Sequence, residues 1–201
     1  KWVNKYPNAG YGFLFRCWAA DSNPRPYNSF GNGSAMRTSP IPYFAKKPSD
    51  LTGKVITFAG ITHNHPEGLK GALVVSTVIN MALRGATKFE IEKYVKTQYE
   101  LDFDYDELVE AYQFDSTCQG SVPEAIYCFL ISQDFEDCLI TSISIGGDSD
   151  TIAAIACSIA EAFYKEIPGE ISSFVLSKLQ EEEKTLLLKF NNLIEKLTVT
   201  T

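Results

Sequence analysis

The sequence predicts an all-α fold, and three features of the 201-residue chain support this class. Apolar side chains recur at helical spacing in several long segments, and few segments alternate between apolar and polar residues as a half-buried strand would. Proline or glycine stands at the ends of these segments. The chain is 45% hydrophobic, which is enough to form the core of one compact helical domain spanning 1–201.

The first quarter of the chain predicts little regular structure. Residues 1–11 are typical of neither a signal peptide nor a helix start. A short helix is predicted over 11–21, and an ordered loop over 21–48, because proline and glycine interrupt that stretch repeatedly. Residues 51–62 predict a short helical or irregular segment that leads to the first long helix.

The middle of the chain predicts a long central helix. It begins near Pro66, which suits a first helical turn, with Asn64 or His65 near the cap. It ends at about Arg84, where Gly85 supplies a stop. Apolar or small side chains occur on most of its sides, so we expect it to be buried.

Further helices are predicted on both sides of a polar loop at 115–122. The first is charged and amphipathic and is expected at the surface, and the last carries its apolar residues on one face. The predicted ranges are 88–100, 102–110, 124–132, 135–145 and 171–197.

Two aspartates and a threonine stand where an apolar helix begins. Asp148, Asp150 and Thr151 follow a glycine pair at 146–147, and no charged residue occurs over 151–160. Carboxylates at the start of a buried helix are costly unless a cation or hydrogen bonds neutralise them. Hard oxygen ligands favour Mg²⁺, Mn²⁺ or Ca²⁺ over zinc. The spacing leaves two interpretations open: a metal site, or one capping and one solvated carboxylate.

A glycine-rich segment in the first predicted loop could bind an anion. Gly31 and Gly33 flank Asn32, so backbone amides can converge on a phosphate, and Ser34 adds a hydroxyl donor. Phe30 offers a surface for stacking a base. The alternative is an ordinary glycine-rich turn. The segment is not a P-loop, because no Gly-Lys-Ser/Thr follows.

A pair of histidines, His63 and His65, comes just before Pro66. The pair could bind a metal, although no third soft ligand is evident nearby. One buried or capping histidine is the simpler interpretation. A third is phosphate contact through a ring N–H.

Composition argues against several classes of partner. The formal net charge of −7 argues against a general nucleic-acid or anionic-membrane surface. No apolar stretch reaches the roughly 18 residues that a membrane-spanning helix requires. The five cysteines form no Cys-x-x-Cys pair, so buried, reduced thiols in a cytoplasmic protein are expected.

Taken together, the three loops resemble the ADP-ribosylglycohydrolase family, which includes the dinitrogenase reductase-activating glycohydrolases and the ADP-ribosyl-acceptor hydrolases. The matching segments occur in family order over nearly the whole chain. They are 31–37 (Gly-Asn-Gly-Ser-Ala-Met-Arg), 62–66 (Thr-His-Asn-His-Pro), 118–123 (Cys-Gln-Gly-Ser-Val-Pro), 146–155 (Gly-Gly-Asp-Ser-Asp-Thr-Ile-Ala-Ala-Ile) and Ile167-Pro168.

The resemblance implies an all-α fold with a binuclear Mg²⁺ centre, for which Mn²⁺ can substitute. The implied reaction is hydrolysis of the glycosidic bond between ADP-ribose and an acceptor, either a protein side chain or a small molecule. By motif, Asp148, Asp150 and Thr151 would ligate metal, with the two aspartates as catalytic residues. The diphosphate, adenine, phosphate or ribose contacts would come from Phe30, Gly31, Asn32, Gly33, Ser34, His63, Gly146 and Gly147.

One departure concerns the N-terminal part of the family domain. The family carries there a glutamate and a Thr-Asp-Asp motif that supply the other metal ligands. This sequence holds no such segment, and Asp21-Ser22 is a weak substitute. We therefore expect an N-terminally truncated family domain that holds two metal ions, one or none. The alternative function is a catalytically degenerate module that binds ADP-ribose or a nucleotide without cleaving it.

Overall fold

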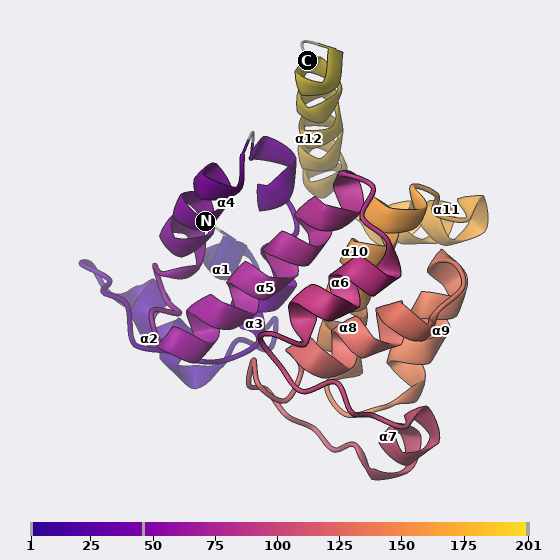
Figure 1. The fold of residues 1–201 in the computed structure, drawn as a ribbon. Helices are drawn as coiled ribbons and strands as arrows, with labels where there is room; N and C mark the ends of the chain where they lie inside the picture. The colour runs from indigo at the N-terminus through magenta and orange to yellow at the C-terminus, as the bar shows by residue number, and fades with distance from the viewer. Residues whose placement is uncertain (1, 46, 200–201) are drawn as a thin grey trace.

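The computed structural model describes residues 2–45 and 47–199, and within these ranges the regular secondary structure is helical (Figure 1). The described residues form no strand, and their only β-type pairing is an isolated bridge between Gly31 and Thr117. The predicted all-α class is therefore confirmed. The helices of the main body are α4 (Pro48–Ala59), α5 (Pro66–Leu83), α6 (Lys88–Val95), α8 (Val122–Ile131), α9 (Phe135–Ser144) and α10 (Ser149–Tyr164).

Helix α5 runs through the body and has the start that the sequence predicts. His65 is its N-cap, and the His65 ring Nδ1 accepts a hydrogen bond from the backbone N–H of Glu67 at 3.1 Å. Pro66 occupies the first turn, where its missing N–H costs no intrahelical hydrogen bond. Gly85 follows the helix with a φ of 83°, a left-handed conformation that glycine adopts without strain.

The hydrophobic core lies where α5, α8, α9 and α10 pack together. The uncharged run that follows Asp150 forms the buried face of α10, with Ile152, Ile155 and Ile159 fully excluded from solvent. These side chains pack in one cluster with Val78 of α5 and other buried residues. A smaller cluster joins α4 to α5. This packing fixes the start of α10 against the body, and it therefore also fixes the position of residues 146–148, which lead into the helix.

Two boundaries before the body differ from the sequence prediction. Residues 21–48 hold a short helix α3 (Gly33–Met36) and a 3₁₀ helix η1 (Ile41–Phe44), where only a loop was expected. Helix α4 begins at Pro48, three residues earlier than predicted, because proline fits a first turn.

Two of the surface helices also differ from their predicted ranges. Helix α6 ends at Val95 rather than near Glu100, and the chain turns over 96–99. Helix α7 (Tyr105–Ala111) lies within one to three residues of its predicted ends.

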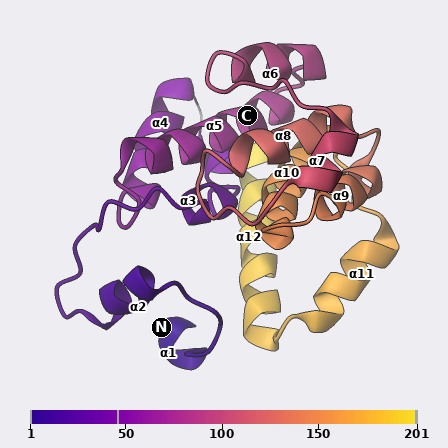
Figure 2. The ribbon, with the colours of Figure 1, turned by 90° about the horizontal axis from the view of Figure 1, so that it is seen from below.

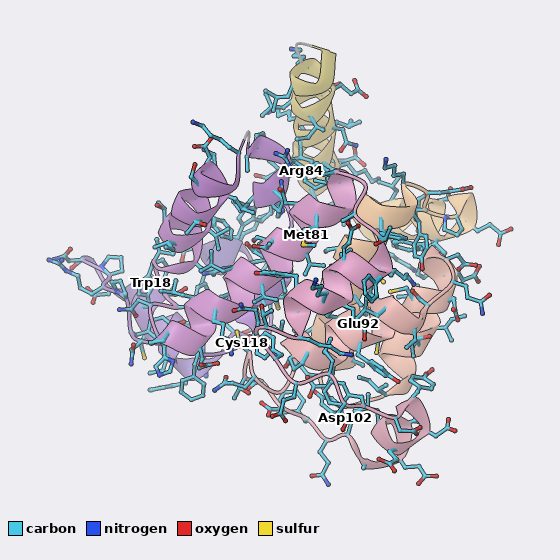
Figure 3. The ribbon with its side chains drawn as sticks, in the orientation of Figure 1. Trp18, Met81, Arg84, Glu92, Asp102 and Cys118 are labelled. Atoms are coloured by element: carbon cyan, nitrogen blue, oxygen red, sulfur yellow. The ribbon has the colours of Figure 1, made fainter. Side chains whose placement is uncertain are left out.

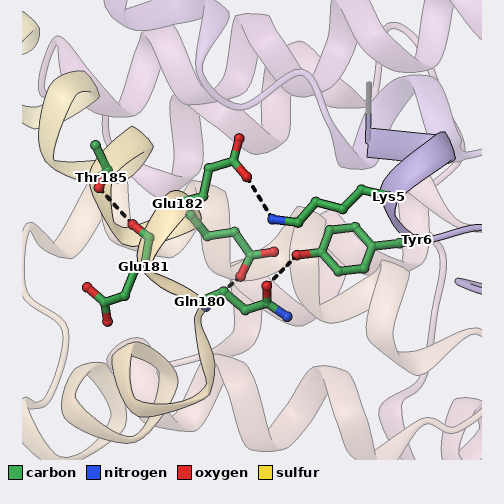
Figure 4. Close-up of polar contacts among 7 residues, drawn as sticks. Lys5, Tyr6, Gln180, Glu181, Glu182 and Thr185 are labelled. Atoms are coloured by element: carbon green, nitrogen blue, oxygen red, sulfur yellow. Dashed lines mark hydrogen bonds and ion pairs between the residues drawn. The ribbon is translucent and has the colours of Figure 1, made fainter.

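The N-terminal residues include a helix that the sequence did not predict. Helix α1 (Trp2–Lys5) precedes α2 (Phe13–Ala20), so the expectation of no helix start over residues 1–11 is wrong for 2–5. Contacts distant in sequence hold this segment (Figure 4): Lys5 Nζ lies 2.7 Å from a carboxylate oxygen of Glu182, and Tyr6 Oη donates to Gln180 Oε1 at 2.7 Å. Such contacts cannot be read from local sequence.

The C-terminal region forms two helices rather than one. Helix α11 (Gly169–Lys178) and α12 (Glu181–Val199) are separated by Leu179 and Gln180, and Leu179 is extended. Phe190 of α12 packs edge-on against the rings of Tyr43 and Phe44, with centroids 5.8 Å apart in each case. In Figure 2, α1, α2, α11 and α12 lie on one side of the body. Across the described part of the chain, no helix combines the length and hydropathy that a bilayer crossing requires.

Candidate functional site

The predicted aspartate segment forms a tight turn between α9 and α10, which we call the aspartate turn (146–151). Gly146 and Gly147 both adopt left-handed backbone conformations, with φ values of 73° and 59°. Asp148 occupies the N-cap position of α10, but its side chain makes no capping hydrogen bond. The capping interpretation of Asp148 therefore does not hold, and its carboxylate is directed to another partner.

That partner is Asn32 of the glycine loop (30–34). Asn32 Nδ2 donates to Asp148 Oδ2 at 2.7 Å and to Ser121 Oγ at 2.9 Å. The backbone N–H of Asn32 donates to the carbonyl of Ser116 at 2.8 Å. Three segments distant in sequence therefore meet at one side chain, and two of the predicted site loops lie side by side.

The candidate metal-ligating residues at the start of α10 differ in exposure. Asp148 is half-buried and Asp150 is exposed, while the Thr151 side chain is buried. Burial raises the pKa of Asp148, the hydrogen bond from Asn32 opposes this increase, and the Asp150 carboxylate adds to it. Two carboxylates and a hydroxyl that interact this closely form a hard-oxygen set that suits Mg²⁺, which commonly takes one or two protein carboxylates and completes its shell with water or phosphate.

Hydrogen bonds from the backbone and side chains of the glycine loop to neighbouring protein groups stabilise its conformation. The backbone N–H of Gly31 donates to Ser29 Oγ at 3.2 Å. The Ser34 hydroxyl is fully buried and donates to the carbonyl of Gly68 at 2.8 Å. The structure therefore directs this hydroxyl to the protein interior, whereas the sequence suggested an anion donor. The backbone N–H groups of Gly33 and Ser34 are in the first turn of α3, where N–H groups have no acceptor within the helix.

Two glycines of α5 allow the loops to pack this closely. A Cβ atom on Gly68 would lie 2.6 Å from the carbonyl oxygen of Ser29, and one on Gly71 would lie 2.5 Å from Cys118 Sγ. Figure 3 shows Cys118 beside α5. Sequence reasoning did not assign a role to these glycines. Their spacing of three, on one face of an otherwise apolar helix, is the signal that could have found them.

The two histidines have separate roles. His63 is 7% exposed, and its ring Nδ1 lies 2.7 Å from Thr62 Oγ1. Burial and the nearby Arg37 lower the pKa of His63 to about 4, so the imidazole is neutral at pH 7. His65 caps α5 instead. The predictions of a buried and a capping histidine are thus both confirmed, one at each position.

An exposed aromatic ring borders the glycine loop. Phe30 is 45% exposed, and its ring centroid lies 5.3 Å from that of His65. A partly exposed ring next to a cluster of backbone amides suits a flat heterocycle such as adenine. Its contact with a base stays a prediction.

A tyrosine that sequence reasoning missed covers the aspartate turn. Tyr112 Oη donates to the carbonyl of Gly120 at 2.5 Å. A Cβ atom on Gly147 would lie 2.5 Å from Tyr112 Cε1, whereas one on Gly146 would meet no atom within 4 Å. Gly147 therefore makes room for Tyr112, and the open side of the turn is at Gly146. Only tertiary structure reveals this contact.

No group of three or more His, Cys, Asp and Glu side chains in the described ranges is arranged to hold a metal ion. The aspartate turn offers two carboxylates and the Thr151 hydroxyl, which donates a hydrogen bond to Met36 Sδ at 3.6 Å. The number of ions at this turn stays a prediction.

The geometry defines an all-α domain in which a glycine loop, a histidine and an acidic helix start converge. The sequence profile of the ADP-ribosylglycohydrolase family matches residues 2–199. The chain therefore belongs to the ADP-ribosylglycohydrolase family.

Named relatives and a solved structure agree with this membership. The chain is 31% identical over 155 residues to ADP-ribosyl-[dinitrogen reductase] glycohydrolase of Rhodospirillum rubrum, covering 74% of this chain and 50% of that protein. It is 28% identical to ADP-ribosylhydrolase ARH3 of Bos taurus, covering 68% and 50%. A solved ADP-ribosylglycohydrolase-related protein complex superposes with a TM-score of 0.68 at 25% identity, covering 94% of this chain and 70% of that one. The chain spans about half the length of these two named relatives.

Proposed function

We propose that this protein hydrolyses the glycosidic bond between ADP-ribose and an acceptor, with Mg²⁺ as cofactor and Mn²⁺ as a substitute. The acceptor would be a protein side chain or a small molecule. The observation that carries the proposal is the hydrogen bond from Asn32 to Asp148, which joins the glycine loop to the aspartate turn. One ligand could therefore place a phosphate at the glycine loop and a sugar carbon at the aspartate turn.

The aspartate turn would hold the reacting end of the substrate. Asp148, Asp150 and Thr151 are the residues that would ligate Mg²⁺. When bound, the ion would polarise a sugar oxygen and lower the pKa of a water. Asn32 would keep the Asp148 carboxylate in place by its 2.7 Å hydrogen bond. The open backbone at Gly146 would admit the terminal ribose.

The glycine loop would hold the distant end of the substrate. The amides of Gly33 and Ser34 would bind the diphosphate, His63 would contact a phosphate or ribose oxygen, and Phe30 would pack on the adenine. Binding energy from these groups would position the glycosidic bond against the acidic helix start. The hydrogen bond from Asn32 to Asp148 would then fix the distance between the two ends of the bound substrate.

Release of free ADP-ribose tests the proposal. Arginine-linked, serine-linked and small-molecule-linked substrates are incubated with the full-length protein and Mg²⁺, and the product is quantified by chromatography. We expect turnover on at least one substrate, its loss in EDTA, and its loss in Asp148→Ala. Asp102→Asn, which changes an exposed loop carboxylate, is the matched control and should retain activity. Absence of turnover on all three linkages would contradict the proposal.

The alternative is a module that binds ADP-ribose without cleaving it. It is favoured by the glycine loop, whose shape is held by hydrogen bonds to Ser29, Ser116 and Gly68, none of which is a proposed metal ligand. Calorimetry with ADP-ribose, combined with the turnover assay in Mg²⁺, distinguishes the two: binding without turnover in Mg²⁺ supports the module, and absent binding removes it. We also propose a cytoplasmic location. Cys118, Cys128 and Cys138 are buried free thiols, as expected for a protein in a reducing compartment.

A further inference from the structure

A hydrogen-bonded chain of three side chains lies behind the glycine loop. Arg37 Nη2 donates to Thr62 Oγ1 at 2.8 Å, and Thr62 Oγ1 lies 2.7 Å from His63 Nδ1. Thr62 is fully buried, so water cannot supply further partners to its hydroxyl. The positions of the protons on Arg37, Thr62 and His63 therefore follow from these three side chains alone.

The proton positions follow from what each group can donate. A guanidinium has donors only, so the Thr62 hydroxyl oxygen must accept from Arg37. The hydroxyl has one proton of its own, and His63 Nδ1 is the nearby acceptor for it. If His63 Nδ1 carried a proton instead, the Thr62 proton would be left buried without an acceptor, at a cost of about 1–3 kcal/mol. Nδ1 is therefore the acceptor, and the ring proton lies on Nε2.

The Nε2 atom of His63 faces the glycine loop. Cβ atoms built on Gly31 and Gly33 would lie 3.6 and 3.5 Å from it, so the ring nitrogen is close to both backbone positions. The lowered pKa of His63, caused by burial and then by Arg37, keeps the ring neutral. A neutral ring with Nε2–H can only donate at this position.

A ring contact holds the Arg37 guanidinium beside Thr62. Its guanidinium carbon lies 5.4 Å from the centre of the Phe58 ring, which supports the group from one side. The ion pairs found among the described side chains do not include Arg37. Its contact with Thr62 is thus a main determinant of where the guanidinium points.

We propose that Arg37 and Thr62 are positioning residues that fix the Nε2–H tautomer of His63 and so present a neutral hydrogen-bond donor to an anion at the glycine loop. The anion half of this statement rests on the proposed function. The tautomer half is independent of any ligand. Neither Arg37 nor Thr62 touches substrate in this scheme.

Nitrogen NMR of the histidine rings tests the tautomer directly. The chain has two histidines, so long-range ¹H–¹⁵N spectra of labelled protein show two ring systems. His65→Asn, which keeps a capping residue at the start of α5, assigns them. In the wild type at pH 7 we expect the His63 spectrum of an Nε2–H ring. In Thr62→Val we expect the Nδ1–H form to be populated, and in Thr62→Ser a return to the wild-type pattern.

His65 supplies an internal control in the same spectra. Its Nδ1 accepts from the backbone of Glu67, so its pattern should not change in the Thr62 or Arg37 variants. Arg37→Met, which removes every side-chain donor at this position, should also populate the Nδ1–H form of His63, because the Thr62 oxygen is then free to accept from the ring. An Nδ1–H ring in the wild type, or an unchanged His63 pattern in Thr62→Val, would overturn the proposal that Arg37 and Thr62 fix the tautomer of His63.

Calorimetry with ADP-ribose tests the anion half. We expect Thr62→Val to weaken binding about tenfold, as for loss of one well-aligned hydrogen bond, and Thr62→Ser to restore it. No binding by the wild type would overturn the proposed function and this half together. Wild-type binding with an unaltered affinity in Thr62→Val would overturn the donor role of His63 and leave the proposed function standing.

Discussion

Asn32 Nδ2 donates to Asp148 Oδ2 at 2.7 Å, and these two residues are 116 positions apart in the sequence. The bond explains how a carboxylate at the start of a buried helix is stabilised. It also joins the glycine loop, for which we propose phosphate binding, to the aspartate turn, for which we propose Mg²⁺ binding. Substitutions around this bond therefore test the site more directly than changes elsewhere.

Replacing Asn32 by alanine should destabilise the fold and loosen the aspartate turn. The substitution removes the partner of Asp148 Oδ2 and of Ser121 Oγ, and we expect a loss of about 1–3 kcal/mol in the free energy of unfolding. Urea denaturation followed by circular dichroism measures it. Asn8→Ala, at an exposed position, is the control and should change stability by less than about 0.5 kcal/mol. Equal effects of the two variants would contradict the assigned role of Asn32.

The two glycines of the aspartate turn should respond differently to alanine. Gly146→Ala introduces only the strain of a left-handed alanine, about 1–2 kcal/mol. Gly147→Ala adds a collision with the Tyr112 ring and should cost more. In a double-mutant cycle, Tyr112→Ala should recover part of the Gly147→Ala loss. Unfolding free energies that add without coupling would show that the contact is absent in solution.

Glycines 71 and 53 give a matched pair within helices. Gly71→Ala in α5 would place a methyl group 2.5 Å from Cys118 Sγ, and we expect a clear loss of stability. Gly53→Ala in α4 meets no atom within 4 Å and should stabilise the protein by about 0.5–1 kcal/mol, since alanine is the better helix former. Thermal unfolding of both variants checks the difference in sign. A stabilised Gly71→Ala protein would contradict the close packing of α5 against residue 118.

A buried glutamate should make stability fall as pH rises. Glu124 of α8 is 8% exposed, its Oε2 has no hydrogen-bond partner, and burial raises its pKa to about 7 from the ordinary value of 4.5. A raised carboxyl pKa means that the folded state binds more protons, so its stabilising contribution is complete below about pH 4.5 and is lost as pH rises through about 7.

Glu124→Gln should remove that dependence. Above pH 7 we expect the variant to be more stable than the wild type, by on the order of 3 kcal/mol at most. Urea denaturation at pH 5, 6, 7 and 8 gives the difference curve. Glu110→Gln, an exposed position on α7, controls for the change in net charge. A Glu124→Gln difference that stays flat across this range would show that the carboxyl is ionised and solvated.

Local patterns in the sequence were enough to predict the central helices. The His65 cap, Pro66 and Gly85 define α5, and the uncharged run after Asp150 defines α10, because these signals act within one helical turn. Helix α1 was missed because polar contacts at its end are distant in sequence: Lys5 contacts Glu182, and Tyr6, the next residue, contacts Gln180.

The candidate site was predicted by residue type more fully than by contact. The sequence indicated Asn32 and Asp148 separately, and only tertiary structure shows that they bind each other. Ser34 shows the opposite outcome, since its hydroxyl is directed to Gly68 in the interior. The roles of Tyr112 and Gly71 depend on how closely two segments pack, which residue spacing alone does not determine.

The measurement closest to the central claim is the rate of ADP-ribose release in Mg²⁺ by the wild type and by Asp148→Asn. This substitution keeps the size of the side chain and removes the negative charge. We expect turnover by the wild type that is abolished by EDTA, and its loss in Asp148→Asn while ADP-ribose binding measured in EDTA persists. Undiminished turnover in Asp148→Asn would contradict the assignment of the aspartate turn as the reacting centre.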